Sequence, residues 1–254
     1  MQSNIVLSIR NISKTYKKKT GPEKQVFNFI SFDIQEKEIF CFLGVNGSGK
    51  TTIASILATL CPPSTGDIFY KGESIYDDLA AYRYKMSFCQ HLPNFNNALS
   101  VQNNLVFAGR FFGLTEKESL DRTFELATQL DFNAQLHEFP KDLSGGFVKR
   151  IMIARALMHA PDVLIIDELS TGLDIHVKKY LWDLIRSLQK NGMTIIVTTQ
   201  NLEEAEELSD RVCILHKKSI LALDTPQNIK NLYHSNLSLS NVFAQLTREE
   251  PTLK

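Results

Sequence analysis

Short apolar runs recur along the chain and predict β-strands. Several of them are unbroken and rich in β-branched and aromatic residues, which is typical of strands buried on both faces of a sheet. The predicted strands are residues 5–9, 26–34, 39–43, 67–70, 85–90, 163–167, 194–199 and 212–216. Because several of these runs lead into helical patterns, we expect a mainly parallel sheet with helices on both faces.

Helical spacing is clearest in residues 175–190. The apolar positions there are Val177, Tyr180, Leu181, Leu184, Ile185 and Leu188, and the sequence KNG follows as a stop signal. Between about His91 and Ala160 the strand pattern disappears and helical patterns take over, for example in residues 116–130. This predicts a helical insertion between two halves of an α/β core. After about His234 a short polar tail remains, apart from LSLSNVFAQLT.

The junction TTQNLEE places Gln200 between a predicted strand and a predicted helix. Asn201 is expected to cap that helix, and Glu203 and Glu204 fall in its first turn, where the helix dipole favours negative charge. Gln200 is therefore expected at the carboxyl end of a strand, the edge at which open α/β sheets bind ligands. The alternative is an ordinary polar residue in a connection.

Composition narrows the range of functions. Charged residues make up 22% of the 254 residues and cancel to a net charge of zero, so a nucleic-acid partner is not favoured. The cluster Lys14, Lys17, Lys18 and Lys19 is interpreted as a solvated loop. The four cysteines form no CxxC pair. We interpret them as small apolar residues, which indicates a reducing compartment.

The amino-terminal sequence MQSNIVLSIRN has the features of neither a signal peptide nor a membrane anchor, and no apolar run approaches the roughly 20 residues that a membrane span needs. We expect a soluble, cytoplasmic protein of one compact unit. Any role at a membrane would have to come through a partner.

The sequence GVNGSGKTT follows an apolar strand and leads into a predicted helix. Glycines in this context let backbone N–H groups approach phosphates, and the helix N-terminus adds positive potential. Lys50 can reach the β- and γ-phosphates of a nucleotide, and the Thr51 hydroxyl can coordinate Mg²⁺. The phosphate loop comprises Gly44, Val45, Asn46, Gly47, Ser48, Gly49, Lys50, Thr51 and Thr52.

The run VLIIDE supplies a second part of such a site, because a buried strand ends there in two carboxylates. Asp167 is predicted to hold Mg²⁺, directly or through water, and Glu168 to polarise an attacking water. A salt-bridging pair is the alternative.

The sequence LSGGFVKRIMIARAL places Ser144, Gly145 and Gly146 at the start of a helix, which is a second anion-binding terminus. It stands upstream of DELSTGLD, and this order resembles the ATP-binding cassette (ABC) ATPases over nearly the whole chain. The resemblance implies a P-loop NTPase core with a mainly parallel sheet, an antiparallel β-subdomain and an inserted helical subdomain. It also implies ATP and Mg²⁺ as ligands.

Other positions resemble the family's motifs residue by residue. Tyr16 resembles the aromatic residue that stacks on adenine, Gln90 the glutamine that contacts Mg²⁺ and leads to the helical subdomain, and Asp174 the aspartate of a loop that crosses the dimer interface. The resemblance places the ATPase domain at residues 1–233, with its core at about 1–90 and 161–233 and its helical subdomain at about 91–160. Residues 234–254 would form a short extension.

Within the family, VQNNLVFAGRFFGL and NLSLSNVFAQLT resemble segments of exporter ATPases of the ABC-2, drug and polysaccharide type. Three positions depart from the family pattern. Phe147 replaces a usual glutamine, Leu169 replaces a usual proline, and Gln200 stands where the family has a histidine that contacts the γ-phosphate. The last change predicts slow hydrolysis.

The resemblance implies a dimer, because the family buries ATP between the phosphate loop of one subunit and the LSGG sequence of another. The expected partners are a second ABC ATPase subunit, identical or related, and integral membrane transporter subunits. Two alternatives remain open. One is a nucleotide-binding subunit with little hydrolysis, and the other is a non-transport ABC protein that acts on ribosomes or DNA.

Overall fold

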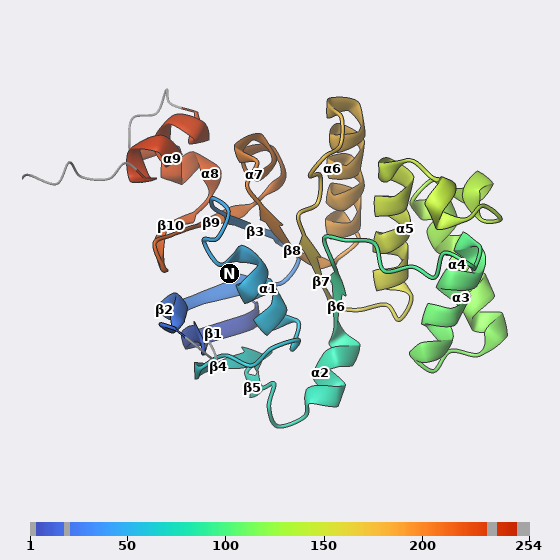
Figure 1. Cartoon of the computed structure of the whole chain (residues 1–254), viewed down its shortest axis with the longest axis horizontal. Coiled ribbons are helices and arrows are strands. Elements are labelled where there is room, and N and C mark those ends of the chain that lie inside the picture. Colours follow the sequence, from blue (N-terminus) through green and yellow to red (C-terminus); the bar gives the residue numbers. More distant parts are fainter. Residues whose placement is uncertain (1–3, 18–20, 233–237, 248–254) are drawn as a thin grey trace, which may run out of the picture.

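The structure of the chain, a computed structural model, describes residues 4–17, 21–232 and 238–247. The unbroken apolar runs form a six-stranded sheet with the strand order β10-β9-β3-β8-β7-β6 (Figure 1). Neighbouring strands from β6 to β9 are parallel, and β10 is antiparallel to β9. The strands are β3 (Ile39–Leu43), β6 (Met86–Cys89), β7 (Val163–Asp167), β8 (Thr194–Thr199), β9 (Arg211–His216) and β10 (Ser219–Asp224). The carboxyl ends of the parallel strands therefore share one edge.

A second sheet is antiparallel, with the order β2-β1-β4-β5, and confirms the expected β-subdomain. Its strands are β1 (Ile5–Tyr16), β2 (Lys24–Gln35), β4 (Thr65–Tyr70) and β5 (Glu73–Ser74). β1 is longer than the sequence pattern predicted. Register shifts follow Ile9, and Asn11 has a φ of 51°, so the alternation of apolar and polar residues breaks while the pairing continues.

The two sheets enclose one of the hydrophobic cores. Phe32 of β2 lies against Phe40 and Phe42 of β3, with ring centroids 5.7 and 5.4 Å away. Helix α1 (Lys50–Leu57) buries Ile53 and Leu57 in the same cluster. The apolar face of α1 is therefore fixed against the core. Its first turn lies at the edge of the sheet, at the site described below.

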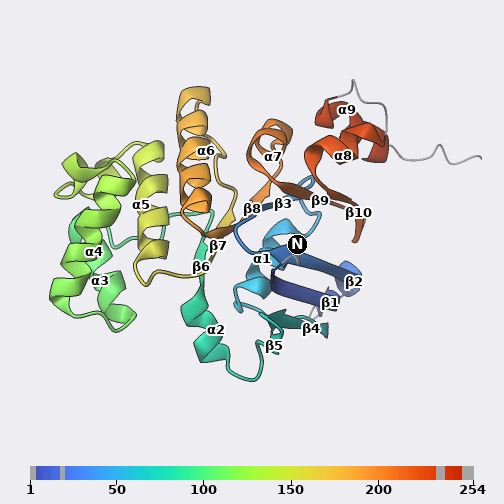
Figure 2. The same cartoon turned by 180° about the vertical axis from the view of Figure 1, so that it is seen from behind.

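Helices cover the remaining faces (Figure 2). They are α2 (Leu79–Lys85), α3 (Val101–Phe111), α4 (Glu116–Gln129), α5 (Gly145–Leu157), α6 (Ile175–Lys190), α7 (Leu202–Leu208), α8 (Pro226–Asn231) and α9 (Leu239–Thr247), with the 3₁₀ turns Asn133–Gln135 and Pro140–Asp142. The helix predicted at residues 175–190 is confirmed. The helix predicted at 116–130 is confirmed with Leu130 as its C-cap, and Thr115 and Glu118 form a capping box at its start.

The segment from α3 to α5 contains no strand, as the loss of the strand pattern predicted. Its core is continuous with one face of the six-stranded sheet, because Leu105, Leu126 and Ile153 share a cluster with Leu164 and Ile195. The division of the chain into core and helical subdomain stays a prediction. The boundary placed between residues 233 and 234 lies outside the described residues.

Two further features differ from expectation. β10 was not predicted, because its residues Ile220 to Asp224 are all half-buried at a sheet edge and give no clear alternation. Lys14 lies on β1 rather than on a solvated loop, it is buried, and its Nζ donates to the carbonyl oxygen of Pro62 at 2.6 Å. A lysine stem can cover apolar surface while its head finds a polar partner. Lys18 and Lys19 lie outside the described residues.

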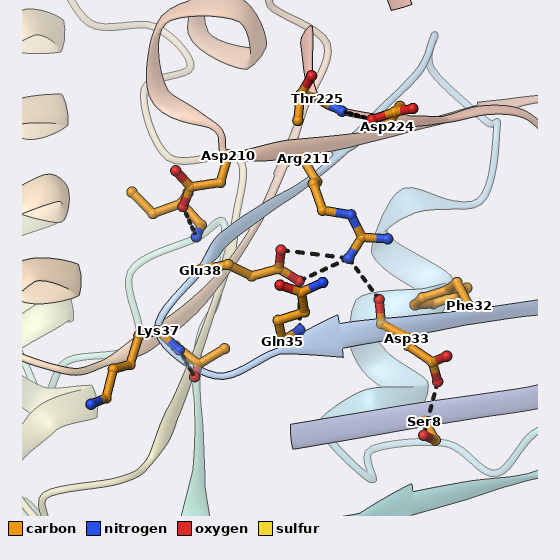
Figure 3. A network of polar contacts seen from close by, with 12 residues as sticks. Ser8, Phe32, Asp33, Gln35, Lys37, Glu38, Asp210, Arg211, Asp224 and Thr225 are labelled. Carbon is orange, nitrogen blue, oxygen red and sulfur yellow. Dashed lines mark hydrogen bonds and ion pairs between the residues drawn. The ribbon is translucent and has the colours of Figure 1, made fainter. Parts of the chain in front are cut away.

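A polar network joins the two sheets at the edge opposite the carboxyl ends of the parallel strands (Figure 3). The Arg211 guanidinium donates to the carbonyl oxygen of Asp33 at 3.0 Å and to Glu38 Oε1 at 3.2 Å. The Asp210 carboxylate accepts from the backbone N–H of Ile39 at 2.7 Å. Burial raises the pKa of Glu38, and its hydrogen bond from the Gln35 N–H and the charge of Arg211 oppose this shift.

In the described residues, no helix has the length and apolar character that crossing a membrane requires.

Candidate functional site

The phosphate loop connects β3 to α1, and Lys50 folds back across it. The Lys50 Nζ donates to the carbonyl oxygens of Gly44 at 2.8 Å and Val45 at 3.1 Å. Burial lowers the pKa of Lys50, while the negative charges of Glu168 and Asp167 oppose that shift. The ammonium group thus lies between the loop and the two carboxylates. The negative charge of a bound phosphate would also attract it there.

The backbone of the loop is shaped for a close approach. Gly49 has a φ of 110°, in the left-handed region that glycine adopts most easily, and a Cβ on Gly44 would lie 2.5 Å from the carbonyl oxygen of Leu215. The Ser48 hydroxyl is buried and has no hydrogen-bond partner among the described residues. The N-cap of α1 is Gly49, which has no side chain to cap the first turn. Open donors at a helix N-terminus fit the phosphates of a nucleotide.

A candidate Mg²⁺ site lies beside this loop. The Thr51 hydroxyl donates to Asp167 Oδ1 at 3.2 Å, and the Thr198 hydroxyl of β8 donates to the same oxygen. Asp167 is buried at the end of β7. Mg²⁺ is usually held by one or two protein oxygens together with phosphates and water, so this donor set fits the ion. Among the described residues no larger group of acidic, histidine or cysteine ligands gathers at one place.

Glu168 follows β7 and has a φ of 53°. Its N–H donates to the carbonyl oxygen and the hydroxyl of Thr198, both at 3.1 Å, and its carbonyl oxygen accepts from Lys149 Nζ at 3.0 Å. Its side chain is 18% exposed, and Oε2 lies 3.4 Å from His91 Nδ1. The backbone is therefore fixed from two sides, while the carboxylate remains accessible to water.

The other predicted residues of the same edge are placed by strand register. Cys89 pairs with Ile166, so Gln90 comes beside Asp167 just beyond β6. Thr199 pairs with Leu43, so Gln200 comes beside the phosphate loop just beyond β8. Both glutamines are exposed. Tyr16, 41% exposed, stands near the loop, because its hydroxyl interacts with Thr52 and lies 4.0 Å from Cys61 Sγ.

The LSGG residues are not part of this group. Ser144 is the N-cap of α5, makes no side-chain capping bond and is exposed. A Cβ on Gly146 would lie 2.8 Å from Val177 Cγ1, which explains the small residue there. In the described part of the chain, α5 lies apart from α1, with β6 and β7 between them (Figure 1 and Figure 2). Asp174 caps α6 by accepting from the N–H groups of His176 and Val177.

Sequence reasoning missed three residues that contact Asp167 or Glu168, namely Thr198, Lys149 and His91. Thr198 offered a signal, because it lies one residue before the end of a predicted strand. Lys149 and His91 gave no such signal. Their contacts depend on how α5 packs on the sheet and on the chain path after β6.

A phosphate loop between a strand and a helix, facing an acidic strand end, defines a P-loop nucleotide-binding protein. Residues 27–171 match the family model described as ABC transporter, which is more than half of the chain. The chain belongs to the ABC transporter family, and its fold is that of the family's ATPase domains. The resemblance deduced from the sequence motifs is thereby confirmed.

Curated relatives and solved structures agree with this membership. The Nod factor export ATP-binding protein I of Rhizobium sp. (strain N33) is 37% identical over 212 residues, covering 82% of this chain and 69% of that protein. The protein of the same name from Burkholderia lata is 33% identical over 220 residues, covering 87% and 71%. A solved ATP-binding subunit of an ABC transporter is 26% identical, with a TM-score of 0.83, covering 96% of this chain and 100% of that one.

Proposed function

We propose that this chain is the ATP-binding and ATP-hydrolysing subunit of a membrane exporter and works as a dimer. The observation that carries the proposal is the meeting of Lys50, Thr51, Asp167 and Glu168 at one edge of the sheet. The names of the relatives, which are export ATP-binding proteins, support the direction of transport.

In this proposal the loop N–H groups and Lys50 hold the β- and γ-phosphates, and Tyr16 stacks on the adenine. Thr51 and Asp167 hold Mg²⁺, with Gln90 beside them. When bound, Mg²⁺ neutralises charge that develops on the phosphates. Thr198 keeps the Asp167 carboxylate in place by donating to Oδ1.

Glu168 is the proposed general base. It accepts a proton from water while the water oxygen bonds to the γ-phosphorus and the bond to the bridging oxygen breaks, which releases ADP and phosphate. Gln200 offers a neutral amide donor to the γ-phosphate, in place of a histidine that can carry charge. We expect slow but measurable turnover for this reason.

The proposed dimer completes the site. Among the described residues Ser144 makes no side-chain capping bond to the first turn of α5, and α5 lies apart from the phosphate loop of its own subunit. A second copy, or a related subunit, would bring Ser144, Gly145 and Gly146 to the opposite nucleotide and Asp174 to the interface. Since ATP would bind the closed pair more tightly than the open one, it would shift the population toward closure.

The helical segment is the proposed contact with the membrane subunits. A cleft of about 480 Å³ lies between β6, α3 and α5. Its rim exposes Phe107 and Phe111, which are 66% and 79% exposed, and Leu60, at 61%. Exposed aromatic side chains at a cleft suit an apolar segment of a membrane subunit.

The Glu168→Gln variant tests this function. It should bind ATP with parental affinity and lose phosphate release, because the phosphate cradle survives while the base is lost. With Mg·ATP it should elute at dimer mass in size-exclusion chromatography. Glu203→Gln, the same change at an exposed position in the first turn of α7, should behave like the parent. A Glu168→Gln protein that remains monomeric with ATP bound would contradict the dimer.

The alternatives separate in the same experiment. A subunit without hydrolysis would show ATP binding in the parent protein and no phosphate release that depends on Glu168. An ABC protein that acts on ribosomes or DNA would co-purify with nucleic acid rather than with a membrane protein.

A further inference from the structure

We propose that His91 is a positioning residue for hydrolysis, which holds the Glu168 carboxylate in the orientation that activates water. This inference rests on the proposed ATPase function and assigns a role to a residue next to Gln90.

The contact follows from strand register. β6 and β7 are parallel, and Cys89 is paired with Ile166. Two residues further along each strand, His91 comes beside Glu168. The imidazole Nδ1 lies 3.4 Å from the carboxylate Oε2, with the histidine side chain 43% exposed and the glutamate 18% exposed.

The carboxylate has few other constraints. The N–H and carbonyl of Glu168 are bonded to Thr198 and Lys149, so the backbone is fixed. Within the described residues, His91 is the one side chain in ion-pair or hydrogen-bond contact with the carboxylate itself. The Glu168 side chain can still rotate about its own torsions although its backbone is fixed. A donor that already holds the carboxylate lowers the entropy cost of reaching the reactive orientation.

The imidazole reaches Glu168 from one side of β7 only. On the β8 side of β7, the residue that comes beside the phosphate loop is Gln200, an exposed amide. The imidazole next to the base comes from the β6 side instead. His91 also lies near the start of the connection from β6 to α3, so a movement of the helical segment would change the distance between the imidazole and the carboxylate.

The test compares four variants. His91→Ala removes the ring, and His91→Phe keeps a ring of similar size without a donor. His91→Asn places an amide N–H close to the position of Nδ1, and His91→Gln places it further out. Steady-state phosphate release gives kcat and KM, a fluorescent ATP analogue gives nucleotide affinity, and thermal unfolding of the nucleotide-free protein reports structural damage.

We expect His91→Ala and His91→Phe to lower kcat about tenfold, with KM, analogue affinity and unfolding temperature close to those of the parent. His91→Asn should recover most of the loss, and more than His91→Gln does. In the Glu168→Gln background, His91→Ala should not lower the residual rate further, because the carboxylate that it positions is absent.

Parental kcat in His91→Ala would overturn the inference while leaving the ATPase function intact. Equal losses in His91→Ala and His91→Asn would also overturn it, since the donor would then be irrelevant. A fall in analogue affinity equal to the fall in kcat would assign His91 to binding instead. If the parent shows no turnover that depends on Glu168, the proposed function fails, and the role of His91 fails with it.

Discussion

The Arg211→Met substitution would remove the charge that compensates Glu38 in the network between the two sheets (Figure 3). The side chain of Glu38 is 7% exposed and that of Arg211 is 20% exposed. Methionine would keep much of the packing against the Phe40 ring, whose centroid lies 5.4 Å from the guanidinium carbon. The Glu38 carboxylate would keep the hydrogen bond from the Gln35 N–H at 2.6 Å but lose its counter-charge.

We expect Arg211→Met to lower the free energy of unfolding by about 3 kcal/mol at neutral pH, the lower end for breaking a buried ion pair, because Arg211 is partly exposed. The pKa of Glu38 is already raised by burial. When the pKa of a carboxyl group is higher in the folded protein than in the unfolded protein, its contribution to stability is greatest at a pH below the unfolded-state pKa. This contribution to stability falls as the pH rises through the folded-state pKa. Losing Arg211 raises that pKa further, so the destabilisation should be smaller at about pH 5 than at about pH 8.

Urea unfolding followed by circular dichroism measures this. With a slope of about 3 kcal/mol per molar urea, the midpoint should fall by about 1 M. Arg10→Met, whose partner Asp33 is 37% exposed, is the matched control and should cost below about 1 kcal/mol. The double variant Arg211→Met with Glu38→Gln should recover at least about 1 kcal/mol relative to Arg211→Met. Equal destabilisation at both pH values, or no recovery in the double variant, would refute the reasoning.

Three further predictions concern the site and the hydrogen bond between Tyr70 and Asp162. Lys50→Ala should abolish ATP binding or turnover, because it removes the charge facing the phosphates, and unchanged binding of a fluorescent ATP analogue would exclude this role. Gln200→His should raise the rate of phosphate release about tenfold, or about 1.4 kcal/mol, with Glu168→Gln as the inactive background, and a rate at or below the parent's would show that the amide is not limiting. Tyr70→Phe should destabilise the protein by about 1 kcal/mol at neutral pH, since the Tyr70 hydroxyl donates to Asp162. Burial raises the pKa of Asp162, but Tyr70 and Lys71 outweigh it and hold the pKa below its ordinary value, so this loss should shrink as urea unfolding is repeated at falling pH.

The fold was largely predictable where each element has a pattern of its own. β3, β7 and β8 have the predicted bounds because unbroken apolar runs of β-branched and aromatic residues leave little choice for a buried strand. The edge strand β10 was missed because half-buried residues produce no such pattern. Glu204 shows the limit of local reasoning. Its place in the first turn of α7 was predicted, yet it is 1% exposed and accepts from Trp182 Nε1 at 2.9 Å.

The sequence by itself determined the phosphate loop, because a strand, the glycines, Lys50 and the first turn of α1 are contiguous and their chemistry needs no distant partner. Only the tertiary structure decided which residues surround Glu168. His91 contacts its carboxylate, while Lys149 and Thr198 bond its backbone. These residues come from three other parts of the chain and meet Glu168 through the strand order β8-β7-β6 and the packing of α5. The same holds for Arg211, which lies 173 residues from Glu38 in sequence. Such contacts depend on which strands become neighbours, and that choice is made by the burial of the whole core rather than by any local pattern.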